Sequence, residues 1–144
     1  MNPGYILAVT AAALWGLTYC LDEKVLAEIS IYKLYFLHSL FGVLLALSIW
    51  LFQGNSVGDL ITLEAEKISW KLLLLTLVVG SLAALAIFGS IQALGASKAS
   101  ILEISYPLFV AIFAFLLWGQ VITLPVLLGG ILIFVGSAII ILWG

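Results

Sequence analysis

Glu103 is the residue of this chain whose type and position best suit chemistry inside a membrane. It lies within a long apolar stretch, and Pro107 follows it four positions later. A charged side chain at membrane depth costs about 2.5–3.5 kcal/mol on insertion scales, so it marks a functional site by default. Proline lacks the N–H that would bond the carbonyl of Glu103. We therefore expect a helix break at Pro107 that offers carboxylate and carbonyl acceptors at one place.

His38 and a few other polar or aromatic residues are expected at a similar depth. At about 1.5 Å of rise per residue, Glu103, His38 and Trp15 all lie about 9–10 Å below the same membrane face. The opposite halves of the helices carry almost nothing polar, which indicates a vestibule open to one face. The other candidates for binding a substrate or proton at nearby levels are Gln92, Ser100 and Tyr106.

Both titratable candidates have a structural alternative. Glu103 could simply be held by a neighbouring helix, or its side chain could reach the membrane interface. A carboxylate that faces lipid is disfavoured, however, so we expect Glu103 to face the bundle interior and to exchange a proton or a substrate there. Histidine side chains can gain or lose a proton near physiological pH, so His38 could tune that carboxylate or relay its proton. Its alternative is a hydrogen-bonded core histidine.

The elements that position these residues are transmembrane helices. A spanning helix needs about 20 apolar residues, whereas barrel strands alternate over about 10. The chain has 144 residues, of which 65% are hydrophobic and 8% charged. We predict an all-α polytopic membrane bundle of five transmembrane helices that forms one domain over 1–144. The helices are expected near residues 4–21, 31–52, 72–94, 99–118 and 121–143.

Several functional classes are not expected. The chain has no arginine and no basic patch, so we expect no nucleic-acid partner. Cys20 is the only cysteine, which leaves no intramolecular disulfide. A single histidine and one intramembrane glutamate fall short of the three or four ligands of a zinc site. No nucleophile–base pair is visible, and we therefore expect neither an enzyme nor a metal or cofactor.

The lysines leave the membrane orientation open. Lys67 and Lys71, with the terminal amine, lie near one face, and Lys24, Lys33 and Lys98 lie near the other. Because the positive charges balance, the positive-inside rule selects no orientation. Either a small protein simply lacks the signal, or the chain inserts both ways and pairs antiparallel with itself.

The last predicted helix carries a stripe of small residues. Glycine lets the backbones of membrane helices approach closely. The stripe therefore indicates a subunit interface, with packing inside the monomer as the alternative. Its residues are Gly129, Gly130, Ile133 and Gly136.

Three segments of the chain resemble the EamA-type repeat of the drug/metabolite transporter superfamily. They are Ala-Leu-Trp-Gly at 13–16 followed by Lys24, the segment 99–109 around its proline, and the glycine-rich segment 129–136. The resemblance covers the full length and reproduces the five-helix count. It implies a plasma-membrane or bacterial inner-membrane transporter of a small metabolite or drug-like molecule, and it leaves proton coupling open.

The chain departs from the pattern of this family in two places. The family often has arginine where His38 stands and glutamate where Gln120 stands. Most relatives join two inverted repeats in ten helices, so a single repeat implies an antiparallel homodimer or a separate partner half. The related small multidrug transporters have four helices and an acid in the first, which this chain lacks. A non-transporting membrane scaffold or regulatory subunit is the alternative function.

Overall fold

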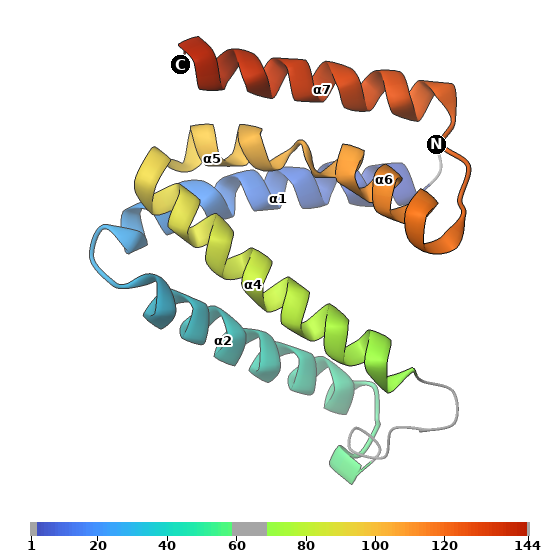
Figure 1. Cartoon of the computed structure of the whole chain (residues 1–144). Coiled ribbons are helices and arrows are strands. Elements are labelled where there is room, and N and C mark those ends of the chain that lie inside the picture. Colours follow the sequence, from blue (N-terminus) through green and yellow to red (C-terminus); the bar gives the residue numbers. More distant parts are fainter. Residues whose placement is uncertain (1–2, 59–68, 144) are drawn as a thin grey trace. The chain divides into compact units, whose positions relative to one another are not determined.

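The computed structural model of the chain describes residues 3–58 and 69–143, so Lys67 lies outside the described residues. Those residues contain helices and no strand (Figure 1). Five segments are long and apolar enough to cross a membrane, and α5 and α6 together make one of them, Ala96–Trp118. The predicted all-α polytopic fold is confirmed. The helices are α1 (Pro3–Leu26), α2 (Ile31–Phe52), α4 (Trp70–Leu94), α5 (Ala96–Glu103), α6 (Tyr106–Trp118) and α7 (Leu124–Trp143).

The chain divides into two compact units. One unit combines Met1–Lys24 with Ser90–Gly144, and the other is Val25–Gly89. In the second unit α2 approaches α4 where α2 begins: a Cβ built on Gly89 would lie 3.8 Å from Cδ1 of Ile31. Leu34 and Phe88 are buried in this unit. The side chain of Ser30 caps α2 by accepting a hydrogen bond from the N–H of Lys33.

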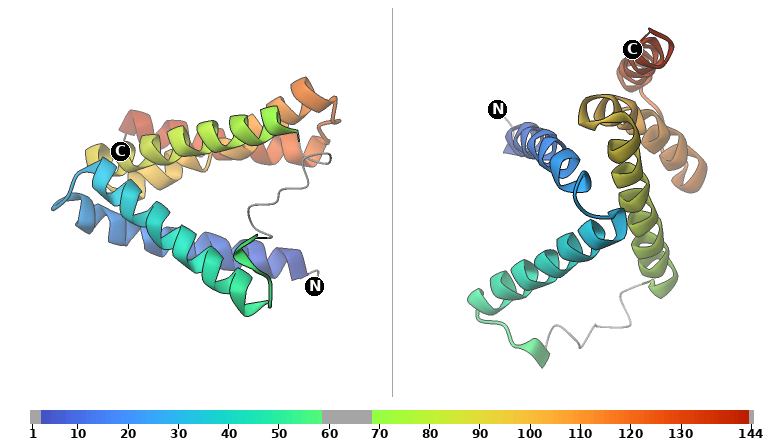
Figure 2. Two further views of the ribbon diagram at one scale, coloured as in Figure 1. Left: turned by 90° about the horizontal axis from the view of Figure 1, so that it is seen from below. Right: turned by 90° about the vertical axis from the view of Figure 1, so that its left-hand side faces the viewer.

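In the first unit, α1 lies beside α5, and α7 lies beside α5 and α6 (Figures 1 and 2). Contacts between α1 and α5 run from Glu23 to Ala96 and from Tyr19 to Glu103. Because residue numbers rise on one helix as they fall on the other, the two helices are antiparallel. This arrangement places Tyr19 of α1 within hydrogen-bond reach of Glu103 at the end of α5.

Three predicted helix ends differ from the structure by three residues or more. The first helix continues to Leu26 instead of 21, since Asp22, Glu23 and Lys24 extend it with Asp22 buried. The fourth starts at Ala96, three residues earlier than expected, because Glu23 caps it. The last begins at Leu124 instead of 121, because Pro125 is tolerated only in the first turn of a helix.

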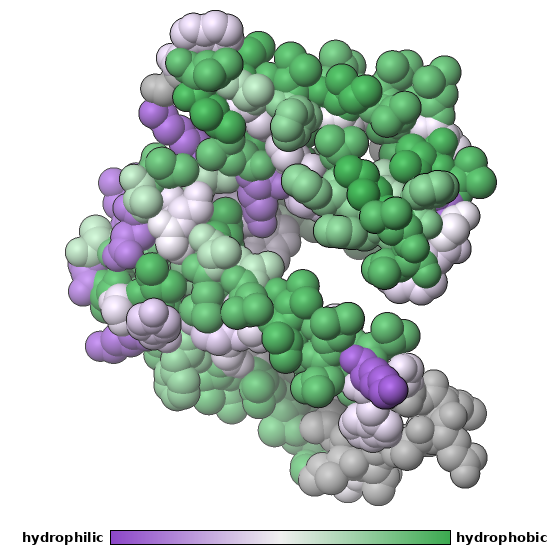
Figure 3. Space-filling view, in the orientation of Figure 1, coloured by the Kyte–Doolittle hydropathy of each residue, from purple (hydrophilic) through white to green (hydrophobic). Residues whose placement is uncertain are grey.

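Large apolar side chains are widely exposed on the described helices. Leu116 is 68% exposed and Phe113 54%, and none of the residues of α6 is buried. Figure 3 shows an almost continuous hydrophobic surface over α6 and α7. In water such a patch would be an aggregation or binding surface. In a bilayer it is the surface that contacts lipid tails, which are as apolar as leucine.

Candidate functional site

The fourth span is interrupted immediately after Glu103. Helix α5 ends at that residue, Ile104 and Ser105 form a turn, and α6 begins at Tyr106. Pro107 is in the first turn of α6, where a missing N–H removes no helical hydrogen bond. It also supplies no N–H to the Glu103 carbonyl, four residues earlier. We call Ile104 and Ser105 the interruption.

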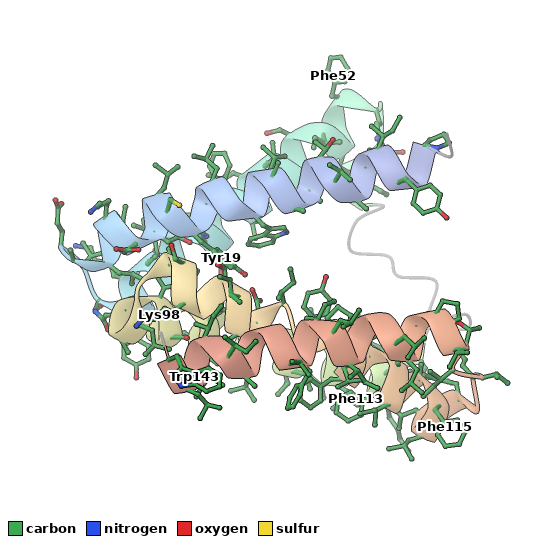
Figure 4. All side chains as sticks on the ribbon, turned by 90° about the horizontal axis from the view of Figure 1, so that it is seen from above. Tyr19, Phe52, Lys98, Phe113, Phe115 and Trp143 are labelled. Carbon is green, nitrogen blue, oxygen red and sulfur yellow. The ribbon has the colours of Figure 1, made fainter. Side chains whose placement is uncertain are left out.

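Tyr19 of α1 holds the carboxylate at the interruption. Its hydroxyl donates a hydrogen bond to Oε2 of Glu103. Tyr19 is 7% exposed, whereas Glu103 is an exposed residue. Figure 4 shows Tyr19 on the side of α1 that faces α5. The carboxylate is therefore anchored on one side by a buried phenol, while Glu103 itself is exposed on the surface of the chain.

Two exposed aromatic residues lie near this pair: Trp15 contacts Tyr19, and Tyr106 begins α6. The ring of Trp15 makes an edge contact with the ring of Tyr19, with centroids 5.9 Å apart and planes at 61°. Trp15 and Tyr106 are each 59% exposed. Trp15 and Tyr19 are four residues apart and so share one face of α1. The structure thus brings Trp15 and Glu103 to a common partner, Tyr19.

Ser100 and Gln92 are two other candidates from the sequence. The hydroxyl of Ser100 donates to the carbonyl of Ser97 at 3.1 Å, within its own helix. Gln92 is exposed near the end of α4. The part of both residues in binding stays a prediction.

His38 belongs to the other compact unit, Val25–Gly89. Its ring meets Phe88 edge-on, with centroids 5.4 Å apart and planes at 85°. The residue itself is exposed. The proposed link between His38 and Glu103 stays a prediction.

The glycine stripe of α7 divides into two parts. A Cβ built on Gly130 would lie 3.1 Å from Cδ1 of Leu108, so Gly130 packs closely against α6. Cβ atoms on Gly129 and Gly136 would meet nothing within 4 Å. The carbonyl of Ile133 lies within hydrogen-bond reach of Ser137 of the same helix. Gly130 therefore serves packing inside the chain, while Gly129 and Gly136 border open space.

Three residues of this region were missed as site candidates from the sequence. Tyr19 could have been found from its spacing of four from Trp15 on one helix face. Ser137 is the only hydroxyl residue of α7. Glu23 accepts a hydrogen bond from the N–H of Ala96 at 2.6 Å and so caps α5, but no local pattern in the sequence pairs these two residues.

Within residues 3–58 and 69–143, no group of three or more His, Cys, Asp or Glu side chains gathers as a metal site would require. What the site offers is a carboxylate, a phenol, aromatic edges and an interrupted backbone. These groups suit the reversible binding of a proton or a polar solute.

Comparison with known proteins identifies the family of the chain. No curated protein and no solved structure matches it. A model of the EamA-like transporter family matches residues 2–142, which is nearly the entire chain and overlaps all five spans of the described residues. This multi-pass membrane protein belongs to the EamA-like transporter family.

Proposed function

We propose that the chain is a transporter subunit in the plasma membrane or bacterial inner membrane that exports or exchanges a small metabolite or drug-like molecule. The Glu103 carboxylate binds the positively charged group of the substrate or a proton that is exchanged for it. The observation that carries this proposal is the hydrogen bond from buried Tyr19 to accessible Glu103, at the end of a helix that stops inside a membrane span.

The geometry supports reversible binding for a physical reason. A carboxylate with no partner inside a membrane is costly, and one sealed in a dry ion pair cannot release its ligand. Glu103 has a neutral donor, Tyr19, which stabilises its negative charge without neutralising it. Trp15 and Tyr106 are exposed close to Glu103 in space or sequence and serve as apolar walls. His38, Gln92 and Ser100 are proposed as secondary contacts to the substrate or proton.

We further propose that two copies work as an antiparallel homodimer. The described residues hold five spans, and transport by two inverted halves that rock around a central site needs a second such set. The open positions at Gly129 and Gly136 suit close approach by a second helix. A separate partner half would satisfy the same requirement.

Transport into proteoliposomes tests the role of Glu103. Purified wild-type protein and Glu103→Gln would be compared for uptake of ethidium and of a mixture of the twenty amino acids, with the external pH varied. Glu28→Gln is the matched control, because Glu28 is exposed and lies beyond the end of α1. We expect pH-dependent uptake of at least one probe by wild type and by the control, and its loss in Glu103→Gln.

Unchanged pH-dependent uptake by Glu103→Gln would remove this carboxylate from the mechanism. The open glycine positions also favour a second candidate function, a non-transporting scaffold or regulatory subunit that assembles through α7. That function predicts no uptake of any probe by wild type. It also predicts that Gly136→Leu releases a partner complex from purified membranes.

A further inference from the structure

The interruption takes a hydrogen-bond donor away from α5, and α7 replaces it. In a continuous helix the carbonyl of Ile101 would accept from the N–H of Ser105. That N–H donates instead to the carbonyl of Leu102, at 3.3 Å. The hydroxyl of Ser137 lies 2.9 Å from the Ile101 carbonyl and can donate to it. A side chain of α7 thus donates a hydrogen bond to a carbonyl that the interruption leaves without its helical donor.

Ser105 adds a second bond to the same hydroxyl. Its Oγ donates to Oγ of Ser137 at 2.9 Å. Ser105 is 7% exposed and Ser137 is 4% exposed, so this connection is buried. The carbonyl of Ile133, at 3.1 Å, is an alternative acceptor for the single Ser137 proton. A small displacement of α7 can therefore redirect the hydrogen bond of the Ser137 hydroxyl from the Ile101 carbonyl of α5 to the Ile133 carbonyl of α7.

Helix α7 also contacts the chain on the other side of the interruption. Gly130 packs against Leu108, the residue that follows Pro107. Gly130 and Ser137 are seven residues apart and so lie on one face of α7. That face touches α6 at Leu108 and α5 at Ile101, and therefore spans the interruption (Figure 1). Ser137 is bonded to both Ile101 and Ser105, and Glu103 lies midway between these two residues in the sequence.

We propose that Ser137 is a positioning residue for Glu103. By bonding Ile101 and Ser105, it holds the end of α5 in the orientation that directs the Glu103 carboxylate to Tyr19. Movement of α7 along α5 and α6 then changes the hydrogen bonding of Glu103, which couples the last helix to the binding site. The transport readout below rests on the proposed function, whereas the spectroscopic readout does not.

The test compares Ser137→Ala with Ser137→Thr in liposomes. Threonine keeps the hydroxyl and alanine removes it. Ser48→Ala is the matched control, because the hydroxyl of Ser48 bonds the carbonyl of Leu44 within its own helix, at 2.7 Å. The first readout is the infrared absorption of the Glu103 carboxyl group from acid to alkaline pH, assigned by its disappearance in Glu103→Gln.

We expect Ser137→Ala to shift or broaden the Glu103 band, while Ser137→Thr and Ser48→Ala leave it in place. The second readout is the substrate concentration that gives half-maximal uptake. It should rise about threefold in Ser137→Ala, the factor that corresponds to one interhelical hydrogen bond in a membrane protein. Maximal uptake should change less, because Glu103 itself is retained.

An unaltered Glu103 band in folded Ser137→Ala overturns the proposal. If that variant does not fold, Ser137→Cys replaces it, since a thiol has similar size and is a weak donor. An unaltered band in Ser137→Cys then overturns the proposal in the same way. If Glu103→Gln transports normally but Ser137→Ala still shifts the band, the proposed function fails and the positioning role of Ser137 stands.

Discussion

The carboxylate of Glu23, near the end of α1, accepts a hydrogen bond from the N–H of Ala96, the first residue of α5, at 2.6 Å. Helix α5 has Gly95 at its N-cap, which brings no side chain to satisfy the first N–H groups. A carboxylate near the N-terminus of a helix also interacts favourably with the helix dipole. A residue of one transmembrane helix therefore caps the helix that carries Glu103.

Replacing Glu23 should destabilise the protein, and by more when the new side chain has no acceptor oxygen. Glu23→Ala removes both the acceptor and the charge, and we expect it to cost about 1–2 kcal/mol, as for the loss of a helix cap. Glu23→Gln keeps an acceptor oxygen and should cost less, about 0.3–1 kcal/mol from the lost charge near the dipole. Unfolding of the purified protein in detergent measures both values, with exposed Glu28→Ala as control. Equal stability of Glu23→Ala and the control would contradict the cap.

Gly95 should not tolerate a side chain. Its φ of 83° and ψ of 159° lie in a region that is essentially restricted to glycine. Gly95→Ala should therefore lower the free energy of unfolding by about 1–3 kcal/mol through backbone strain. The control is Gly42→Ala, since Gly42 lies within α2 and a Cβ there would meet nothing within 4 Å. Because alanine favours helix, the control should be neutral or slightly stabilising.

Tyr19→Phe separates the hydroxyl of Tyr19 from its ring. Phenylalanine keeps the contact with Trp15 but cannot donate to Glu103. We expect a loss of about 1 kcal/mol in unfolding free energy, within the range for interhelical hydrogen bonds in membranes. Uptake should weaken without the complete loss expected for Glu103→Gln. Tyr32→Phe, at a residue that is 76% exposed, is the control. Full stability and full uptake in Tyr19→Phe would show that the hydroxyl has no role.

The two parts of the glycine stripe should respond differently to a large side chain. Gly130→Leu must displace Leu108, so we expect it to lower the thermal stability of the chain itself. Gly136→Leu meets open space and should leave that stability unchanged while it reduces the dimer fraction. Chemical crosslinking in liposomes measures the dimer fraction, and circular dichroism on heating measures the stability. An undiminished dimer fraction in Gly136→Leu would remove this position from the interface.

Much of the helical fold could be predicted from the sequence alone. A run of about 20 apolar residues is long enough to span the hydrocarbon core, and backbone groups in lipid must be bonded within their own helix. These two facts predict five spans at nearly the observed places. They do not predict where each helix ends beyond its apolar run. Helix α1, for example, extends to Leu26 through residues whose charges suggested a loop. Such ends depend on partners from other helices, as Glu23 and Ala96 demonstrate.

The sequence by itself determined that a charged residue, Glu103, lies inside a span just before a proline. Only the tertiary structure decided what touches it. Depth in a membrane follows from counting residues along a helix, but the direction of a side chain around the helix axis does not. Tyr19 meets Glu103, and Ser137 meets Ile101, because α1 and α7 pack against α5 in particular registers. Those registers arise from contacts between segments far apart in the chain, which no local pattern encodes.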